Sequence, residues 1–269
     1  MDDQNDDQEP APLRASEQEM IRNLQDMGTN FIFLFGKQGV GKTAIVASLL
    51  YYLASECHYG NLEKKGNRKG QHRGELFRQA IASRRFPERS TPQVFAVESL
   101  FVPSNNRGHL SKLPLTFLEM DGKSLAEVSI MSNGQLHPDI DIYFKAGTLS
   151  LLFLMVTSPQ EAQQDDHLMV EFLDYINQKS PRFRDARVLF LISKWDTYSG
   201  QESVSDFLKR KMPSTFRRLS KSTNAYGAFS VGYVENNVGG EPFIHEYDSR
   251  PARAVFEWIY QTLTGKKLS

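Results

Sequence analysis

The chain has 269 residues, of which 40% are hydrophobic, and its 32 Lys and Arg balance its 32 Asp and Glu. This length and apolar fraction are sufficient for one core with an insertion. The zero net charge argues against a globally basic nucleic-acid-binding chain. A single cysteine excludes an internal disulfide and suits a reducing cytoplasm. The apolar runs are too short to span a bilayer and the start lacks a secretory signal, so we expect a cytoplasmic protein.

Charge is distributed unevenly along the chain. Residues 1–28 begin with an acidic, apolar-poor stretch, which predicts a disordered or loosely docked tail. Residues 29–269 are expected to form one domain with a basic insertion at about 59–92. Its basic stretch, residues 63–90, contains only Phe77 and Phe86 as interleaved aromatics, which disfavours nucleic-acid binding. None of the six histidines has zinc-ligand spacing with the cysteine, so we expect no structural zinc.

Short apolar segments alternate with amphipathic ones, which predicts an α/β fold: a mostly parallel six-stranded sheet with helices on both faces. The expected strands are 31–35, 93–103, 113–121, 148–158, 186–196 and 224–234. The expected helices are 42–55, 165–178, a helix near 202–220 and one that begins around Pro251. The short connection between the second and third strands predicts an antiparallel hairpin. Residues 235–250 are expected to form a loop.

A glycine-rich motif follows the first strand and precedes the first expected helix. Residues 36–43, Gly-Lys-Gln-Gly-Val-Gly-Lys-Thr, match G-x-x-x-x-G-K-[ST] at every fixed position. Backbone N–H groups of such a loop surround nucleotide phosphates, and the helix start adds positive potential. Lys42 is expected to reach the β- and γ-phosphates, and the Thr43 hydroxyl to bind Mg²⁺. The predicted phosphate-binding residues are Gly36, Lys37, Gln38, Gly39, Val40, Gly41, Lys42, Thr43 and Ala44.

The end of the fifth expected strand carries Ser193-Lys194-Trp195-Asp196. This resembles the [NT]-K-x-D guanine-recognition motif of Ras-like and translation-factor GTPases, with serine in place of Asn or Thr. A carboxylate at Asp196 can accept hydrogen bonds from both N1–H and N2–H₂ of guanine, a pattern that adenine does not offer. The Lys194 stem can lie along the base. The resemblance implies a last base contact at Ser230 and Val231; the alternative is that the motif is an ordinary charged surface turn.

The third expected strand ends in Glu119-Met120-Asp121-Gly122. Ras-like GTPases have D-x-x-G here, which implies that Gly122 senses the γ-phosphate. Glu119 has the register of the family's Mg²⁺-associated aspartate and Asp121 has its residue type, so either carboxylate is a candidate. Lys123 stands where the family has a water-orienting glutamine. A cation cannot accept a hydrogen bond from water, so we expect slow hydrolysis, or a water oriented by another group.

The basic insertion ends just before the second expected strand, where the resemblance implies a switch threonine that binds Mg²⁺ and γ-phosphate. Thr91 is the candidate. Arg84, Arg85 or Arg89 could supply an arginine to the γ-phosphate in cis. The alternative, a solvated basic surface or a site for an acidic partner, is favoured by the usual behaviour of such charge runs.

From Phe31 to about Leu263 the chain resembles a divergent P-loop GTPase of the Ras-like/translation-factor (TRAFAC) superclass. Its large insertion and E-x-D-G variant look closer to divergent bacterial double-GTPase proteins than to an ordinary small GTPase. The resemblance implies GTP/GDP and Mg as cofactors, a slow GTPase acting as a switch, and a protein partner or dimer that contacts the switch surface. The implied catalytic residues are Lys42, Thr91 and Gly122; the implied metal residues are Thr43, Thr91, Glu119 and Asp121. The alternatives are a P-loop ATPase and a pseudo-GTPase that binds nucleotide without turnover.

Overall fold

The structure is a computed structural model that describes residues 15–57, 68–88, 95–101, 112–119, 138–147, 149–179, 187–221, 224–237 and 239–268. Four predicted site residues lie outside these ranges together with Lys123: Arg89, Thr91, Asp121 and Gly122. Their roles stay predictions.

A six-stranded sheet with the order β2-β3-β1-β4-β5-β6 forms the centre of the molecule. The strands are β1 (Asn30–Phe35), β2 (Phe95–Phe101), β3 (Leu113–Glu119), β4 (Ser150–Thr157), β5 (Val188–Ile192) and β6 (Ala225–Ala228). Only β2 runs antiparallel, paired with β3, and every other pairing in this sheet is parallel. The predicted α/β class and the predicted antiparallel edge hairpin are confirmed.

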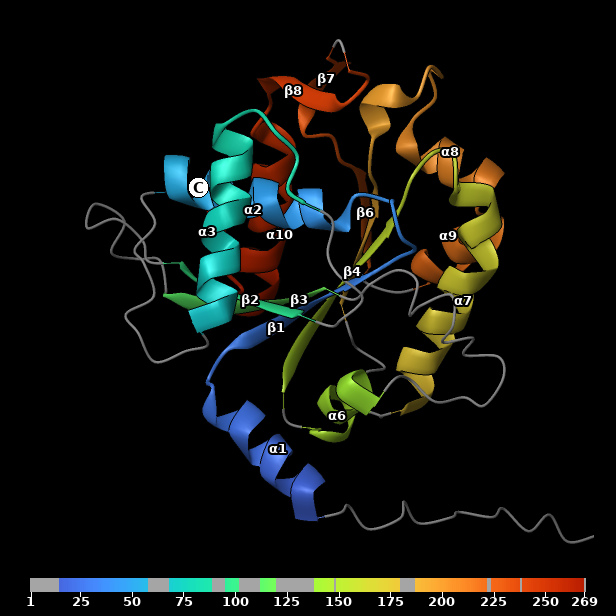
Figure 1. Ribbon diagram of the computed structural model, residues 1–269. Helices are drawn as coiled ribbons and strands as arrows, with labels where there is room; N and C mark the ends of the chain where they lie inside the picture. The colour runs from blue at the N-terminus through green and yellow to red at the C-terminus, as the bar shows by residue number, and fades with distance from the viewer. Residues whose placement is uncertain are drawn as a thin grey trace, which may run out of the picture.

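Helices cover both faces of this sheet (Figure 1). One face is covered by α2 (Lys42–Glu56), α3 (Arg68–Ala82) and α10 (Arg250–Thr264), and the other by α6 (Pro138–Lys145), α7 (Ala162–Lys179), α8 (Val204–Lys211) and α9 (Pro213–Leu219). The central strand β4 contributes to both layers because its side chains alternate. Leu154 and Val156 pack in the first core, and Phe153 and Met155 in the second.

Part of the predicted tail is helical. Residues 15–26 form α1 (Ala15–Asp26), which lies against α6 (Figure 1). Ile21 is buried beside Ile142 and Ala146, and Lys145 Nζ forms an ion pair with Glu17 Oε1 at 3.1 Å. A single buried apolar residue supplies little hydrophobic stabilisation, so this helix has a small contact with the domain.

The end of the chain differs from the sequence-based expectation in three places. The helix expected near 202–220 is two helices, because Pro213 has no N–H to continue the hydrogen-bond ladder of α8. The strand expected at 224–234 is also two strands, since β6 ends at Ala228 and β7 (Gly232–Asn236) leaves the sheet. The loop expected at 235–250 contains β8 (Pro242–Tyr247), which pairs antiparallel with β7 in a separate hairpin.

Candidate functional site

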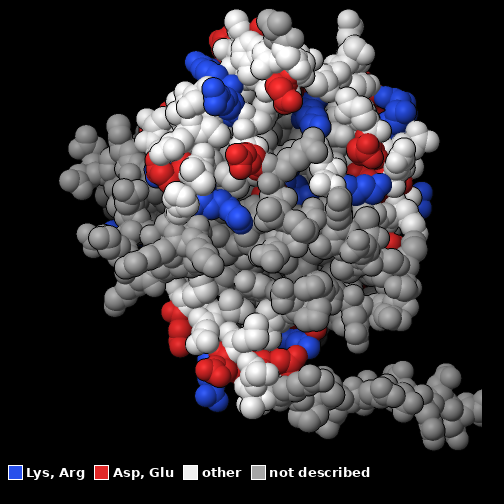
Figure 2. Space-filling view, viewed as in Figure 1, with Lys and Arg blue, Asp and Glu red and all other residues white. Residues whose placement is uncertain are grey.

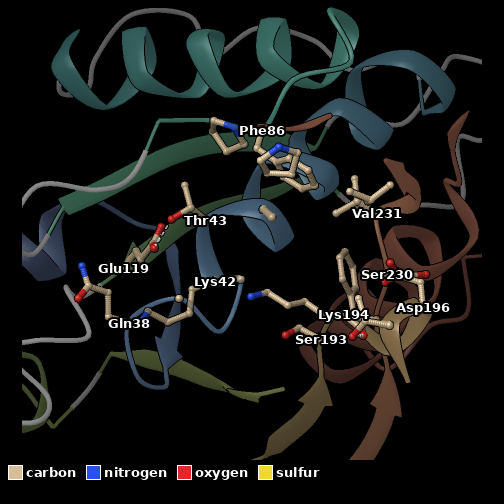
Figure 3. A pocket seen from close by; sticks show the side chains of 18 residues that line it. Gln38, Lys42, Thr43, Phe86, Glu119, Ser193, Lys194, Asp196, Ser230 and Val231 are labelled. Carbon is tan, nitrogen blue, oxygen red and sulfur yellow. Dashed lines mark hydrogen bonds between the residues drawn. The ribbon is translucent and has the colours of Figure 1, made fainter. Parts of the chain in front are cut away.

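A cavity of about 570 Å³ opens where β1, β3, β5 and β6 end (Figure 3). Ligands of parallel α/β sheets bind at this edge, and cavities of this size accommodate small molecules. The structure brings most of the predicted site residues into its wall. Those that line it are Gln38, Gly39, Gly41, Lys42, Thr43, Ala44, Glu119, Lys194, Asp196, Ser230 and Val231.

Residues 36–43, which we call the phosphate loop after their predicted role, fold back over their own lysine. Lys42 begins α2, its side chain is buried, and its Nζ donates to Gly36 O at 2.7 Å and to Lys37 O at 2.9 Å. Gly39 and Gly41 have φ of 83° and 92°, a region that residues with a Cβ rarely enter. The loop therefore holds a cation at its centre, which suits a phosphate ligand.

Gly36 packs directly against the neighbouring strand. A Cβ at this position would lie 2.2 Å from Val156 O, a backbone atom of β4 that cannot swing away. The first glycine of the motif is thus required by the close approach of two main chains.

Thr43 and Glu119 meet beside the loop. Glu119 ends β3 with only 2% of its surface exposed, and Thr43 Oγ1 donates to Glu119 Oε1 at 2.5 Å. A hydroxyl and a carboxylate are oxygen donors of the kind that Mg²⁺ takes. No group of three or more His, Cys, Asp or Glu that could hold a metal occurs among the described residues. A Mg²⁺ ion at this place would therefore need phosphate oxygens and waters as further ligands, which fits its usual coordination.

Ser193 joins the end of β5 to the phosphate loop. Its side chain is 2% exposed, and its hydroxyl contacts Val40 O and lies 3.0 Å from Thr157 O. Its backbone N–H donates to Thr157 O at 2.8 Å. A Cβ added to Gly41 would touch the Ser193 hydroxyl at 3.4 Å, so the two segments are in close contact. The hydrogen bond from Ser193 to Val40 positions the two segments relative to each other.

Lys194 and Asp196 follow Ser193 toward the other end of the cavity. Lys194 adopts a left-handed backbone (φ 52°), which is uncommon outside glycine and is found at functional sites. Its side chain extends from the strand end toward the phosphate loop, whereas Asp196 lies beside Ser230 (Figure 3). Partial burial raises the pKa of the Asp196 carboxyl, and Lys194 opposes this shift more weakly.

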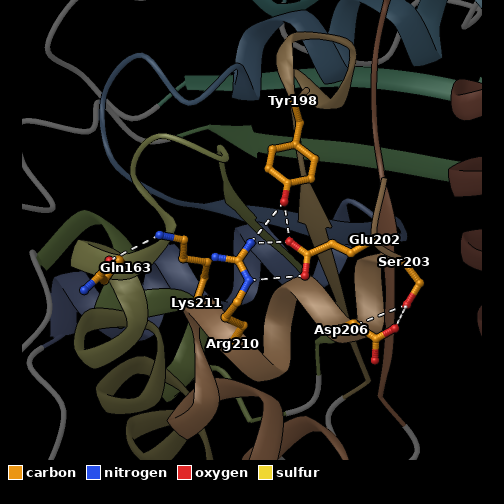
Figure 4. A network of polar contacts seen from close by, with 7 residues as sticks. All are labelled: Gln163, Tyr198, Glu202, Ser203, Asp206, Arg210 and Lys211. Atoms are coloured by element: carbon orange, nitrogen blue, oxygen red, sulfur yellow. Dashed lines mark hydrogen bonds and ion pairs between the residues drawn. The ribbon is translucent and has the colours of Figure 1, made fainter. Parts of the chain in front are cut away.

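Aromatic and polar contacts hold the short helix η3 (Trp195–Thr197) that carries Asp196. The Trp195 ring packs against Tyr198 and Phe207, with centroids 4.8 and 5.3 Å apart. The Tyr198 hydroxyl contacts Glu202, and Arg210 donates to both of them (Figure 4). The backbone N–H of Trp195 also donates to Phe229 O at 3.2 Å, which ties this segment to the loop after β6.

The hairpin β7–β8 and the segment after α3 form an apolar wall that the sequence does not indicate. Residues on this wall are Phe86, Pro87, Val234 and Pro242. The backbone holds it together: Ile244 N–H donates to Arg84 O at 2.9 Å, and Arg85 bridges to Phe243. The side chains of Arg84 and Arg85 do not line the cavity.

Lys37, predicted to bind phosphate, points out of the cavity. Its Nζ lies 2.7 Å from Oδ1 of Asp165, a fully buried carboxylate in the first turn of α7. Thr157 Oγ1 donates to the other carboxylate oxygen at 2.6 Å. Sequence inspection overlooks Asp165 because an acidic residue in a first helical turn is common.

The described surface away from the cavity gives less information about function. Figure 2 shows Lys/Arg and Asp/Glu side chains interspersed over the described residues of one face. Within the ranges that the structure covers, no helix has the length and apolarity needed to span a membrane.

Comparisons with known proteins show similarity in structure alone. No family model matches the sequence, and no curated protein matches it significantly. One similar solved structure is a dimerization-deficient mutant of Toc33 from Arabidopsis thaliana (12% identity, 94% of this chain and 93% of that chain, TM-score 0.46). Another is the SRb-GTP/SRX complex of the signal recognition particle receptor from Chaetomium thermophilum (13% identity, 87% of this chain and 98% of that chain, TM-score 0.45). A variant of SsGBP matches with 13% identity over 80% of this chain and 57% of that chain (TM-score 0.36).

Proposed function

We propose that this protein binds GTP and GDP with Mg²⁺ and acts as a nucleotide-controlled switch with slow GTP hydrolysis. One observation carries the proposal: the hydroxyl of Ser193 contacts Val40 O, so the Ser-Lys-Trp-Asp motif and the phosphate loop form two ends of one cavity. This arrangement supports a single ligand with its phosphates at one end and its base at the candidate guanine-binding carboxylate.

At the phosphate end, the backbone of residues 36–43 and the Lys42 ammonium bind the β- and γ-phosphates. Thr43 and Glu119 would hold Mg²⁺, which would supply positive charge at the phosphate oxygens. The hydrogen bond between these two side chains holds their oxygens close together. Thr91 and Gly122 remain candidates for γ-phosphate sensing.

At the other end, Asp196 accepts two hydrogen bonds from guanine and the Lys194 stem lies along the base. Ser230 and Val231 supply the last base contacts. The apolar wall that contains Phe86 and Val234 faces the same end and would bury the base. The bound base would shield the Asp196 carboxylate from water, so leaving this carboxylate unpaired with adenine costs binding free energy, and this gives discrimination against ATP.

Hydrolysis requires a group that orients the attacking water. Among the described residues lining the cavity, Gln38 is the one that bears a side-chain amide. Its carbonyl can accept a hydrogen bond from water, which the ammonium of Lys123 cannot do. Figure 3 places Gln38 on the same side of the cavity as Glu119, at the phosphate end.

The test is competition binding of GTP, ATP and xanthosine triphosphate, with Mg²⁺ present, to the wild type and to Asp196→Asn. The wild type is expected to prefer GTP over ATP about 100-fold, or 2.7 kcal/mol. The variant is expected to shift toward xanthosine triphosphate, because its side-chain amide complements the additional carbonyl of xanthine. Equal binding of GTP and ATP, unchanged by the substitution, would refute guanine recognition.

That result would favour the P-loop ATPase alternative, in which the Ser-Lys-Trp-Asp motif is a surface turn. Multiple-turnover phosphate release separates the remaining alternative, a pseudo-GTPase that binds without turnover. A GTP-dependent change in affinity for a protein partner, or in dimerization, would support the switch role.

A further inference from the structure

We propose that Lys37 and Asp165 form a positioning pair that holds the phosphate loop in its ligand-binding conformation. The inference rests on the proposed function, because it concerns the phosphate end of the same cavity. Although Lys37 belongs to a phosphate-binding motif, its proposed contact is with Asp165 and not with the phosphates.

The Asp165 carboxylate is enclosed. Its side chain has no exposed surface, and it receives the Lys37 ammonium on one oxygen (2.7 Å) and the Thr157 hydroxyl on the other (2.6 Å). Thr157 is itself fully buried at the end of β4, and its carbonyl accepts from Ser193 N–H. The pair therefore connects the loop to the start of α7 and to the segment that carries the base-recognition motif.

Lys37 is held at two points. Its side chain reaches Asp165, while its backbone carbonyl accepts from Lys42 Nζ at 2.9 Å. Fixing the side chain therefore fixes a carbonyl that orients the Lys42 ammonium. Lys37 does not line the cavity, so its charge acts on phosphate through the loop and through Lys42.

The free-energy balance favours a Lys37–Asp165 ion pair that stays formed. Removing the Lys37 ammonium, whose side chain is 30% exposed, leaves the fully buried Asp165 carboxylate without its countercharge, whereas replacing both partners with neutral groups relieves that penalty. A loop held before the ligand arrives loses less conformational entropy on binding. The Lys37–Asp165 ion pair should therefore strengthen the binding of ligands that carry phosphates. It should not change the affinity for a ligand that lacks phosphates.

The experiment compares GDP with guanosine, since both have the same base and only GDP engages the loop. The variants are Lys37→Met, Asp165→Asn, the double variant Lys37→Met/Asp165→Asn, and Lys37→Arg as the conservative change. The matched control is Arg218→Met, which breaks the ion pair of Arg218 with Asp174 (2.9 Å), also on α7 but partly exposed. Calorimetric titration gives both affinities, and thermal unfolding gives stability.

The Kd for GDP is expected to rise about tenfold in each single variant and in the double variant, while the Kd for guanosine changes less than about twofold. Lys37→Arg and the control are expected to bind GDP as the wild type does. The double variant contains no unpaired buried charge, so it keeps the test valid if a single variant does not fold.

Two results would overturn the inference: a double variant that binds GDP like the wild type, or equal losses for GDP and guanosine. The second result would assign the pair to fold stability alone. Failure of the proposed function has a different signature, because the wild type itself would then bind GDP no more tightly than ADP, or would bind neither.

Discussion

Substitution of Gly36 by alanine tests the geometry of the phosphate loop most directly. The added Cβ would lie 2.2 Å from Val156 O, where ordinary contact begins at 3.4 Å. The loop and β4 must therefore move apart by about 1 Å, and forced overpacking of this kind typically costs about 1–3 kcal/mol or more. Because the displaced segment includes the carbonyl that binds Lys42 Nζ, we expect loss of nucleotide binding as well as of stability.

Gly39→Ala is the matched control within the same loop. Gly39 has φ of 83° and no atom within 4 Å of the position that a Cβ would take, so the substitution incurs only the left-handed backbone cost of about 1–2 kcal/mol. Urea unfolding gives the free energies and a GDP titration gives binding. The reasoning is refuted if Gly36→Ala loses no more stability than Gly39→Ala, or if it binds GDP as the wild type does.

Three further predictions concern the rest of the cavity. Because partial burial raises the Asp196 pKa and guanine requires the ionised carboxylate, GTP affinity should fall on acidification at a higher pH than an ordinary aspartate would give. Asp196→Asn should remove this dependence in titrations from pH 8 down to about 4, which reaches the range of an ordinary aspartate. Ser193→Ala should lower the free energy of unfolding, measured in urea, by about 1 kcal/mol. Ser193→Thr keeps the hydroxyl and should unfold with the wild-type free energy, so equal losses in the two variants would contradict the Val40 contact. Gln38→Ala should slow single-turnover hydrolysis about tenfold, which corresponds to about 1.4 kcal/mol in activation free energy, without weakening GTP binding. An unchanged rate would exclude Gln38 as the water-orienting group.

The sequence predicts the sheet and the strand–loop–helix unit around residues 36–43 well because their signals are local. Strands β1 and β4 are continuous apolar runs, and the loop has a fixed spacing of glycines and lysine. The meeting of Glu119 with Thr43 follows from parallel strands whose ends share one edge.

The hairpin β7–β8 is less predictable, since its pairing depends on distant atoms. Its connecting residues, 237–241, are polar and glycine-rich, as in a loop, and β7 follows β6 after only three residues. The break occurs at Gly232, where φ is 134° and a Cβ would lie 2.0 Å from Glu246 O. Nothing in the neighbouring sequence reveals that close approach.

Asp165 is unpredictable for a similar reason. As a residue in the first turn of α7 it resembles any acidic residue at a helix start. Its burial results from the packing of α7 onto β4, and its partner lies far away in the sequence.

The pairing of β8 with Arg84 has a consequence for the order in which the site assembles. The phosphate loop and β1–β5 lie N-terminal to residue 193, whereas the apolar wall requires Pro242 and Ile244 from near the end of the chain. Contacts between such distant segments carry a loop-closure cost that local contacts do not. During synthesis, the phosphate end can therefore form first, and the base end is completed only after the last part of the chain has emerged. A ribosome-bound chain truncated before residue 240 would contain the elements proposed to bind phosphate but would lack β8, which completes the apolar wall.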